Sequence, residues 1–213
     1  MANNQKMRTE SDLLGSVELP ADVLYGVQTL RGIENFRISK FHLNEYPLFI
    51  KGLAVTKLGA AEANHKLGLL TDEKFNAIAQ ACREIMDGKH HDAFPVDMIQ
   101  GGAGTTTNMN ANEVIANRAL EIMGHQYGEY QYCSPNDDVN CAQSTNDATR
   151  RLFTWYVRYA SEAGRAPEAT DRILRKEGCG VRRCPQDGPH AARRRRADDF
   201  GPDFPRFRQH PAR

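Results

Sequence analysis

Residues 100–147 carry most of the information in this chain and read QGGAGTTTNMNANEVIANRALEIMGHQYGEYQYCSPNDDVNCAQSTND. Two loops within them, Gly101–Asn110 and Asn140–Asp147, are rich in small hydroxyl and amide residues and carry almost no charge. Hydroxyl and amide groups can hydrogen-bond the carboxylates of a small polar substrate, and they can stabilise a carboxylate that gains negative charge during a reaction. The composition of the two loops therefore favours a small-molecule substrate that carries carboxylates.

The apolar residues that precede this segment follow helical spacing. Pro47 suits a first helical turn, and the pattern predicts a long helix from there to about Leu67. Thr71 is a good N-cap, and the pattern predicts a second helix that begins after it and closes at Gly88.

A third helix is predicted between the two polar loops, over about 110–123, with Gly124 as its stop. The rest of the first 148 residues offers little regular patterning. Residues 1–45 look mostly irregular, and only 130–133 suggest a short strand. The expected fold class is therefore mainly α.

Length and composition limit the class of protein. With 213 residues and 40% hydrophobic content, the chain can form one large or two small domains with a core. No apolar run approaches the roughly 18 residues of a membrane span, and the N-terminus lacks the charged-then-apolar pattern of a signal peptide. The five cysteines are scattered, with no CxxC pair and no zinc spacing. These features predict a cytoplasmic protein with reduced thiols, no membrane partner and no metal site.

The residues from Thr149 onward differ in charge and composition from the rest. They hold 16 Lys and Arg against 8 Asp and Glu, a net charge of +8, whereas residues 1–148 hold 12 against 19, a net charge of −7. Gly, Pro and Arg dominate after about residue 163, and such a composition buries too little apolar surface to offset chain entropy. We expect a largely disordered tail, whose run Arg193–Arg196 taken alone would indicate a nucleic-acid partner.

The first 147 residues resemble the aspartase/fumarase superfamily, and more closely its aspartate ammonia-lyase branch. The likeness begins at the DLLG of residues 12–15, continues through the YGVQT of residues 25–29 and runs unbroken to Asp147. It implies the N-terminal domain of a mainly α fold, followed by a central bundle of long helices. The full-length family protein is a homotetramer in which each active site combines segments of three subunits.

The resemblance also implies a reaction. Members eliminate a group from a four-carbon dicarboxylate to give fumarate, by removing the proton next to the β-carboxylate and forming an aci-carboxylate intermediate. No cofactor is expected. The family's substrate-contacting positions in this half fall on the motifs GTTTN and QSTND. Carried across, Thr105 would contact substrate from the first loop, and Ser144, Thr145 and Asn146 from the second. A single Thr or Ser is more often a turn or cap residue, but two such loops in the family's order favour the binding role.

Motif details separate the two main branches of the family. Fumarases usually carry a His before the PND triplet, where this chain has Ser134. They also tend to read TGSGT, where residues 101–105 read GGAGT. These differences favour aspartate ammonia-lyase, and a fumarate hydratase fragment is the alternative.

The tail reads like family sequence in another reading frame. Where the family commonly continues STNDAYPTALH, this chain reads STNDATRRLFT, and loss of one base in the Tyr codon converts the first into the second over Thr149–Thr154. A second family segment, KMGRTQLxDAVPMTLGQ, matches Gln186–Pro202 when it is read from the third base of each codon. We therefore interpret 1–147 as the lyase domain and 148–213 as a frameshifted tail that needs no nucleic-acid partner.

The function predicted from the sequence is aspartate ammonia-lyase, which converts L-aspartate to fumarate and ammonia. The family's later GSSxMPGKxNP loop, whose Ser is the general base, is missing, so no catalytic residue is assigned. We expect the truncated chain as written to be inactive. A small basic-tailed nucleic-acid-binding protein is the remaining alternative.

Overall fold

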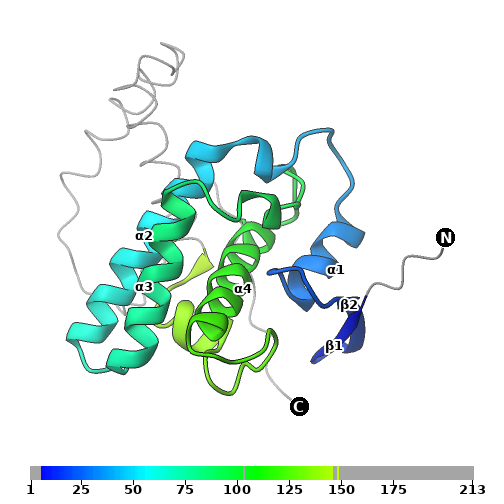
Figure 1. Cartoon of the computed structure of the whole chain (residues 1–213). Coiled ribbons are helices and arrows are strands. Elements are labelled where there is room, and N and C mark those ends of the chain that lie inside the picture. The colour runs from blue at the N-terminus through cyan, green and yellow to red at the C-terminus, as the bar shows by residue number, and fades with distance from the viewer. Residues whose placement is uncertain (1–5, 103, 146–147, 149–213) are drawn as a thin grey trace, which may run out of the picture. The chain divides into compact units, whose positions relative to one another are not determined.

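The structure, a computed structural model, describes residues 6–102, 104–145 and 148. This part of the chain is mainly α, as the sequence predicts (Figure 1). Its α-helices are α1 (Val27–Asn35), α2 (Pro47–Lys66), α3 (Asp72–Met86) and α4 (Thr105–Ile122). Its shorter helical turns are η1 (Leu43–Glu45), η2 (His91–Ala93) and the π-helical turn η3 (Pro135–Val139). The predicted frameshifted tail, apart from Ala148, lies outside the described residues.

Helices α2 and α3 confirm the helical spacing of the sequence. Helix α2 begins at Pro47, whose fixed backbone suits the first turn. Helix α3 follows Thr71, whose side-chain oxygen accepts a hydrogen bond from Lys74 N at 3.4 Å. The two helices pack against each other along their length. Among the described residues, no helix has both the length and the apolar character needed to cross a bilayer.

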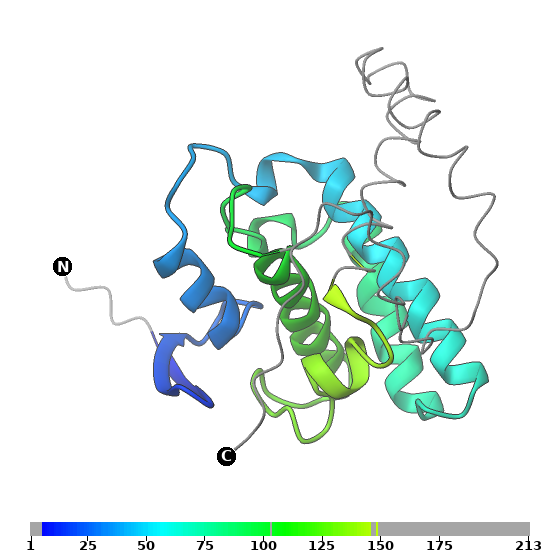
Figure 2. The same cartoon turned by 180° about the vertical axis from the view of Figure 1, so that it is seen from behind.

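Helix α4 is the centre of the described fold. It contacts α1, α2, α3 and η3, and both views show it between α1 on one side and the α2–α3 pair on the other (Figures 1 and 2). Twelve of its 18 residues are buried, so the helix has no solvent-facing stripe along most of its length. The core around it is formed mainly by Ile50, Leu53, Ile78, Ile85, Phe94, Val114, Ile115 and Leu120.

The first turn of α4 starts earlier than the sequence indicates. The helix begins at Thr105, whereas apolar spacing predicts a start near residue 110. The Thr- and Asn-rich turn looks like a loop because its residues favour caps and turns. A side chain from outside the helix supports it: Gln100 Oε1 accepts from Thr107 N at 2.9 Å, and Gln100 Nε2 donates to Thr107 Oγ1 at 2.5 Å. Much of the predicted first polar loop is therefore helical.

The N-terminal 45 residues are more ordered than their sequence suggests. Strands β1 (Met7–Asp12) and β2 (Gly15–Pro20) form an antiparallel hairpin in which Asp12 pairs with Gly15. Helix α1 follows, so the expectation of a mostly irregular segment is wrong. Strand β1 reads MRTESD and shows no alternation of apolar and polar residues. Polar contacts to the rest of the domain hold the strand in place instead.

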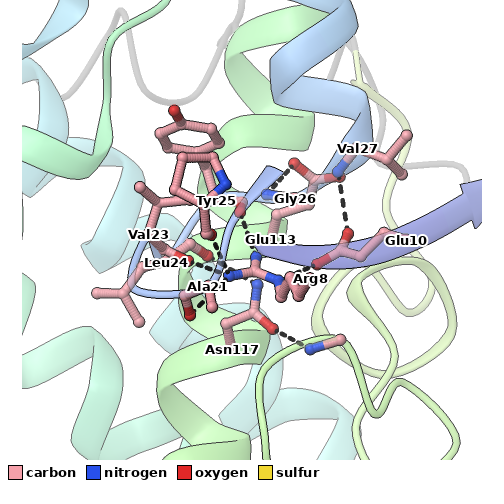
Figure 3. A network of polar contacts seen from close by, with 12 residues as sticks. Arg8, Glu10, Ala21, Val23, Leu24, Tyr25, Gly26, Val27, Glu113 and Asn117 are labelled. Atoms are coloured by element: carbon pink, nitrogen blue, oxygen red, sulfur yellow. Dashed lines mark hydrogen bonds and ion pairs between the residues drawn. The ribbon is translucent and has the colours of Figure 1, made fainter. Parts of the chain in front are cut away.

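Arg8 makes the main polar contacts that hold the hairpin in place. Its guanidinium donates to the carbonyl oxygens of Val23 at 2.6 Å and Tyr25 at 2.7 Å, and it pairs with Glu10 at 2.9 Å (Figure 3). Asn117 of α4 donates to Leu24 O at 2.7 Å in the same region. Buried backbone carbonyls need such donors, so Arg8 and Asn117 stabilise the irregular connection between β2 and α1.

Glu113 of α4 holds the start of α1. Its carboxylate accepts from the backbone N–H groups of Gly26 at 2.9 Å, Gln28 at 2.8 Å and Thr29 at 3.0 Å, and from the Thr29 hydroxyl at 2.6 Å. Gly26 leaves no room for a side chain, since a Cβ there would lie 2.5 Å from the Tyr130 hydroxyl and 2.9 Å from Glu113 Cδ. The carboxylate therefore replaces a local cap for α1 (Figure 3).

The strand suggested over 130–133 is absent. The backbone of these residues forms turns, and Gly128 just before them has a φ of 87°. Cys133 is fully buried while Tyr132 is 46% exposed. The alternation that suggested a strand thus comes from a turn that inserts single side chains into the core.

Candidate functional site

The two polar segments predicted from the sequence meet at the start of α4. Asn108 in the second turn of α4 donates through Nδ2 to Asn140 Oδ1 at 3.1 Å. Asn140 is the first residue of the second loop. The structure therefore joins the two segments, although they lie 32 positions apart in the chain.

The first segment presents a helix N-terminus with little steric cover. Thr105 is the first residue of α4 and is exposed. Gly102 and Gly104 before it have φ values of 75° and 88°, which other residues adopt only at a cost. The first turn of α4 carries no acidic residue. Apart from the Thr107 N–H that Gln100 accepts from, the positive end of the helix dipole has no acidic partner in its own first turn and could face an anion.

A cavity of about 360 Å³ lies beside this helix start. Its volume falls within the range typical of small-molecule sites. Its walls combine apolar side chains with the glycine backbone of the first segment, and they comprise Phe49, Met98, Ile99, Gln100, Gly102, Gly104 and Thr107. A small ligand in the cavity would lie within reach of Thr107 and the backbone near Thr105.

The second segment turns sharply before the predicted substrate contacts. Ala142 has a φ of 54°, in the left-handed region that is uncommon for a non-glycine residue. Ser144 beyond it is exposed and Thr145 is half-buried, and Ser144 O accepts from Ala148 N at 3.1 Å. Asn146, the fourth predicted contact, lies outside the described residues. The binding roles of all four remain predictions.

Lys57 is the polar residue at this site that the sequence analysis did not select. Its side chain, on α2, is fully buried. Its Nζ donates to Asn140 Oδ1 at 2.9 Å and to Gln143 Oε1 at 3.0 Å. Burial lowers the pKa of Lys57 to about 7. The sequence feature that could have identified Lys57 is its position on an otherwise apolar helix face, which also carries Leu53, Ala54 and Ala61.

Asn64, two turns further along α2, contacts the same loop. It is 5% exposed and donates through Nδ2 to Cys141 O at 2.9 Å. Residues 57 and 64 are seven positions apart and therefore lie on one face of the helix. Helix α2 thus holds the second loop from two residues: Lys57 contacts both sides of the strained Ala142 backbone, and Asn64 contacts Cys141 just before it.

No group of three or more His, Cys, Asp and Glu side chains within the described ranges is arranged to hold a metal ion. The polar groups that gather at the start of α4 are amides, hydroxyls, backbone N–H groups and one buried amine. Such a set suits an organic anion rather than a divalent cation, which favours carboxylate and carbonyl oxygens.

Comparison with proteins of known sequence gives the chain its relatives. The aspartate ammonia-lyase of Pseudomonas canavaninivorans is 60% identical over 148 residues, which make up 70% of this chain and 31% of that protein. The Escherichia coli protein of the same name is 56% identical over 149 residues, again 70% of this chain and 31% of its own length. This chain therefore spans about a third of the length of the curated relatives that it matches.

Solved structures agree with the sequence comparison. A fumarate lyase:delta crystallin from Brucella melitensis matches with a TM-score of 0.73 and 48% identity, over 74% of this chain and 34% of its own. A class II fumarase from Schistosoma mansoni matches with a TM-score of 0.66 and 35% identity, over 71% of this chain and 32% of its own. A family model described as lyase matches residues 15–160. With the fold, the motifs and these matches in agreement, the chain belongs to this lyase family, the aspartase/fumarase superfamily.

Proposed function

We propose that this chain is the N-terminal domain of an aspartate ammonia-lyase, a carbon–nitrogen lyase that converts L-aspartate to fumarate and ammonia. The observation that carries the proposal is the meeting of two neutral, hydroxyl- and amide-rich segments at the start of α4, through Asn108 and Asn140. The 60% identity to a protein named aspartate ammonia-lyase supports the choice of reaction.

The proposed chemistry needs donors for negative charge. Removal of the proton next to the β-carboxylate gives an aci-carboxylate, which carries more negative charge than the substrate. We assign the hydrogen bonds to substrate carboxylates to Thr105, Ser144, Thr145 and Asn146. Prearranged neutral donors stabilise charge that develops in the transition state, and they bind the dianionic product less tightly than fixed cations would. The proton-abstracting base is assigned to the family sequence beyond Asp147.

The proposal includes an assembly and a location. In keeping with the family resemblance, the complete protein is a homotetramer whose sites combine several subunits, and its partner is a small molecule rather than a nucleic acid or a membrane. A reducing compartment such as the cytoplasm suits the described cysteines Cys82, Cys133 and Cys141, which are free thiols. Residues 1–147 form the lyase domain in this proposal. The tail that would favour a nucleic-acid partner lies outside the described residues.

A chimera tests the reaction directly. Residues 1–148 of this chain are joined to the remaining two thirds of the Pseudomonas canavaninivorans relative, and fumarate release is followed by its ultraviolet absorbance. We expect turnover of L-aspartate and none of L-malate. The matched control is the unaltered relative, which shows that the assay and the carboxyl-terminal part are sound.

The same assay addresses the alternative. A fumarate hydratase would turn over L-malate and leave L-aspartate unchanged, and that result would replace the proposed reaction. The Schistosoma mansoni fumarase supports this alternative only through its fold and 35% identity. A chimera that folds and assembles but acts on neither substrate would show that residues 1–148 do not form a lyase site.

A further inference from the structure

Lys57 lies in an environment that is unfavourable for an ordinary surface lysine. Its side chain is fully buried in the middle of α2. Leu53, Ala54 and Ala61 on the same helix are also buried. Within the described ranges it forms no ion pair with a carboxylate, and the acceptors of its amine are two neutral amide oxygens. A buried ammonium without a counter-charge is costly, which makes the residue a candidate for a functional role.

We propose that Lys57 is a positioning residue of the substrate site, which fixes the loop carrying Ser144 and Thr145 through Asn140 and Gln143 and places its amine behind the bound carboxylates. The part of the proposal that concerns the loop rests on the structure alone. The part that concerns the carboxylates rests on the proposed function.

The contacts of the amine span the loop. Lys57 Nζ reaches Asn140 and Gln143, which lie on either side of the turn at Ala142. The two residues are also joined directly, since Asn140 Nδ2 donates to the backbone carbonyl oxygen of Gln143 at 3.0 Å. Because Ala142 adopts the left-handed region, the turn depends on outside contacts to keep its shape. Gln143 directly precedes Ser144, so a change at the amine is transmitted to the first predicted substrate contact.

The same amine is also linked through hydrogen bonds to the first polar segment. Asn140 Oδ1 accepts both from Lys57 Nζ and from Asn108 Nδ2 of α4. Asn108 is 1% exposed, and its own Oδ1 has no hydrogen-bond partner among the described residues. One acceptor therefore links the helix that carries Thr105 with the loop that carries Ser144. Lys57 is the only donor with a formal charge in this described set.

Among the described residues, the groups packed around the amine carry no charge that would offset its own. From α3 it faces the Cys82 thiol, whose pKa burial raises to about 12, so this thiol is neutral near pH 7. From the loop it faces Asn140 and Gln143, and the Asn108 amide lies beyond Asn140. A neutral amine keeps two N–H groups and can retain both hydrogen bonds. Loss of the proton thus changes the charge behind the site more than its geometry.

Anion binding and the proton on Lys57 are therefore coupled. A dicarboxylate at Ser144 and Thr145 favours the charged amine, and by linkage the charged amine favours the dicarboxylate by the same factor. The affinity for a dicarboxylate should fall as pH rises through the range in which Lys57 loses its proton. A purely structural lysine would give no such dependence.

The first test uses the 213-residue chain without any ligand. The uniformly ¹³C- and ¹⁵N-labelled chain is titrated by NMR, and the Lys57 side-chain signal is assigned through its bonds to the sequentially assigned backbone. We expect this signal to titrate near pH 7 and the backbone amides of Ser144 and Thr145 to follow the same midpoint. The exposed Lys66 is the internal control. A Lys57 signal with the midpoint of a free lysine, or loop amides that ignore its titration, would overturn the proposal without any variant needing to fold.

The second test measures anion affinity in the active chimera. Succinate serves as the dicarboxylate probe, and its inhibition constant is measured from about pH 6 to pH 9. We expect the constant to rise about tenfold or more over this range in the parent chimera, and to be weak and nearly constant in Lys57→Met. The control variant is Lys66→Met on the exposed face of α2, which should match the parent.

The two tests separate the possible failures. An active chimera in which Lys57→Met leaves the succinate constant and its pH dependence unchanged would refute the role of Lys57 while the proposed function stands. A chimera that does not act on aspartate, together with loop amides that titrate with Lys57, would refute the proposed function while the link between Lys57 and the loop stands.

Discussion

Two buried ionisable residues, Lys57 and Glu113, show how single side chains shape this domain. Each is satisfied by neutral groups: Lys57 by amide oxygens, and Glu113 by backbone N–H groups and a hydroxyl. Burial lowers the pKa of Lys57 to about 7 and raises the pKa of Glu113, and the hydrogen bonds to Glu113 offset part of its shift. Burial therefore disfavours the charged form of each residue relative to an exposed side chain.

The shifted pKa of Lys57 predicts that stability depends on pH. Between about pH 7 and the ordinary lysine value of 10.5, the unfolded chain binds more protons than the folded one. The free energy of unfolding should therefore rise with pH across this window, by about 1.4 kcal/mol for each unit of pKa difference that is crossed. Urea unfolding at a series of pH values should show this rise in the wild-type chain and a much flatter profile in Lys57→Met. Parallel profiles for the two proteins would contradict the prediction.

Glu113 should be sensitive to a nearly isosteric change. In Glu113→Gln one carboxylate oxygen becomes an NH₂ group, which cannot accept from the start of α1. At least one donor is then left without an acceptor, which costs about 1–3 kcal/mol, so we expect a loss of about 1–3 kcal/mol in the free energy of unfolding. The exposed Glu34→Gln on α1 is the matched control and should stay within about 0.5 kcal/mol. Equal effects of the two substitutions would exclude this role for Glu113.

Thr105 and Asn146 should affect catalysis rather than stability. In the chimera, Thr105→Ala and Asn146→Ala are expected to lower kcat/KM for aspartate about 10²–10³-fold, as loss of a donor to developing charge does. Thr71→Ala is the contrasting control, because the Thr71 side chain caps α3. It should cost about 1 kcal/mol of stability and leave kcat/KM near the parent value. A lower melting temperature with normal kcat/KM in Thr105→Ala would make Thr105 structural too.

Individual helices are joined by a small number of strong polar contacts. Glu84 of α3 accepts from Arg118 of α4 at 2.6 Å and 3.0 Å, a two-pronged pair that holds the two helices together. Hydrogen bonds from Arg118 lower the pKa of Glu84 to about 2. This contact ties the edge of the α2–α3 pair to the central helix.

The Glu84–Arg118 pair predicts acid sensitivity. Because the folded pKa of Glu84 lies below its ordinary value of 4.5, its contribution is present above pH 4.5 and is lost as pH falls toward 2. We expect Glu84→Gln to cost about 1–3 kcal/mol near neutral pH and to reduce the loss of stability in acid. Glu62→Gln is the control, since its pair with Lys66 is largely exposed and worth little. Acid unfolding followed by circular dichroism provides the measurement.

The elements that the sequence predicts well are those with local causes. Pro47 and Thr71 start α2 and α3 where the sequence places them, because first-turn proline and N-cap chemistry act within a few residues. The hairpin and α1 escape prediction because their support is distant: Glu113, the residue that caps α1, lies 87 positions from Gly26.

The same distinction between local and distant causes applies to the candidate site. The residue types of the two polar segments are visible in the sequence, and their meeting at α4 fits the family resemblance. The supporting residues Lys57 and Asn108 are not visible in this way. In the sequence, a lysine within an apolar helix face looks like a residue that reaches the surface. The structure shows instead that its amine donates hydrogen bonds to Asn140 and Gln143. Such roles depend on tertiary contacts that no local pattern encodes.

At the scale of the whole molecule, the described domain holds part of a proposed composite site. The chain covers 31% of the length of its relative from Pseudomonas canavaninivorans, and the base is assigned to sequence beyond Asp147. A site built from several subunits places these parts on different copies of the chain. The N-terminal domain of one subunit must then be correctly folded for a site that it shares with a neighbouring subunit to be active.

Mixing two chimeras that are each strongly impaired tests this arrangement. One is the Thr105→Ala chimera, and the other is a chimera disabled at the serine of its GSSxMPGKxNP loop. Dissociation and reassociation of the mixture should restore part of the aspartate turnover, because some sites then receive both intact segments. Each protein treated alone is the control. Native mass spectrometry checks that mixed tetramers form, and mixed tetramers without activity would place the site within one chain.

Strand β1 is held by a hydrogen bond to a residue far along the chain, and this has a consequence for synthesis on the ribosome. Glu10 in β1 accepts from the Tyr130 hydroxyl, and 120 positions separate the two residues. At about 5–20 residues per second, the emerging hairpin waits on the order of 10 s for that partner. During this interval Leu13 and Leu14 at its tip, both highly exposed even in the finished fold, and its unpaired strand edges are open to other nascent chains. The N-terminus, which is made first, is therefore among the last parts of the described domain to be secured.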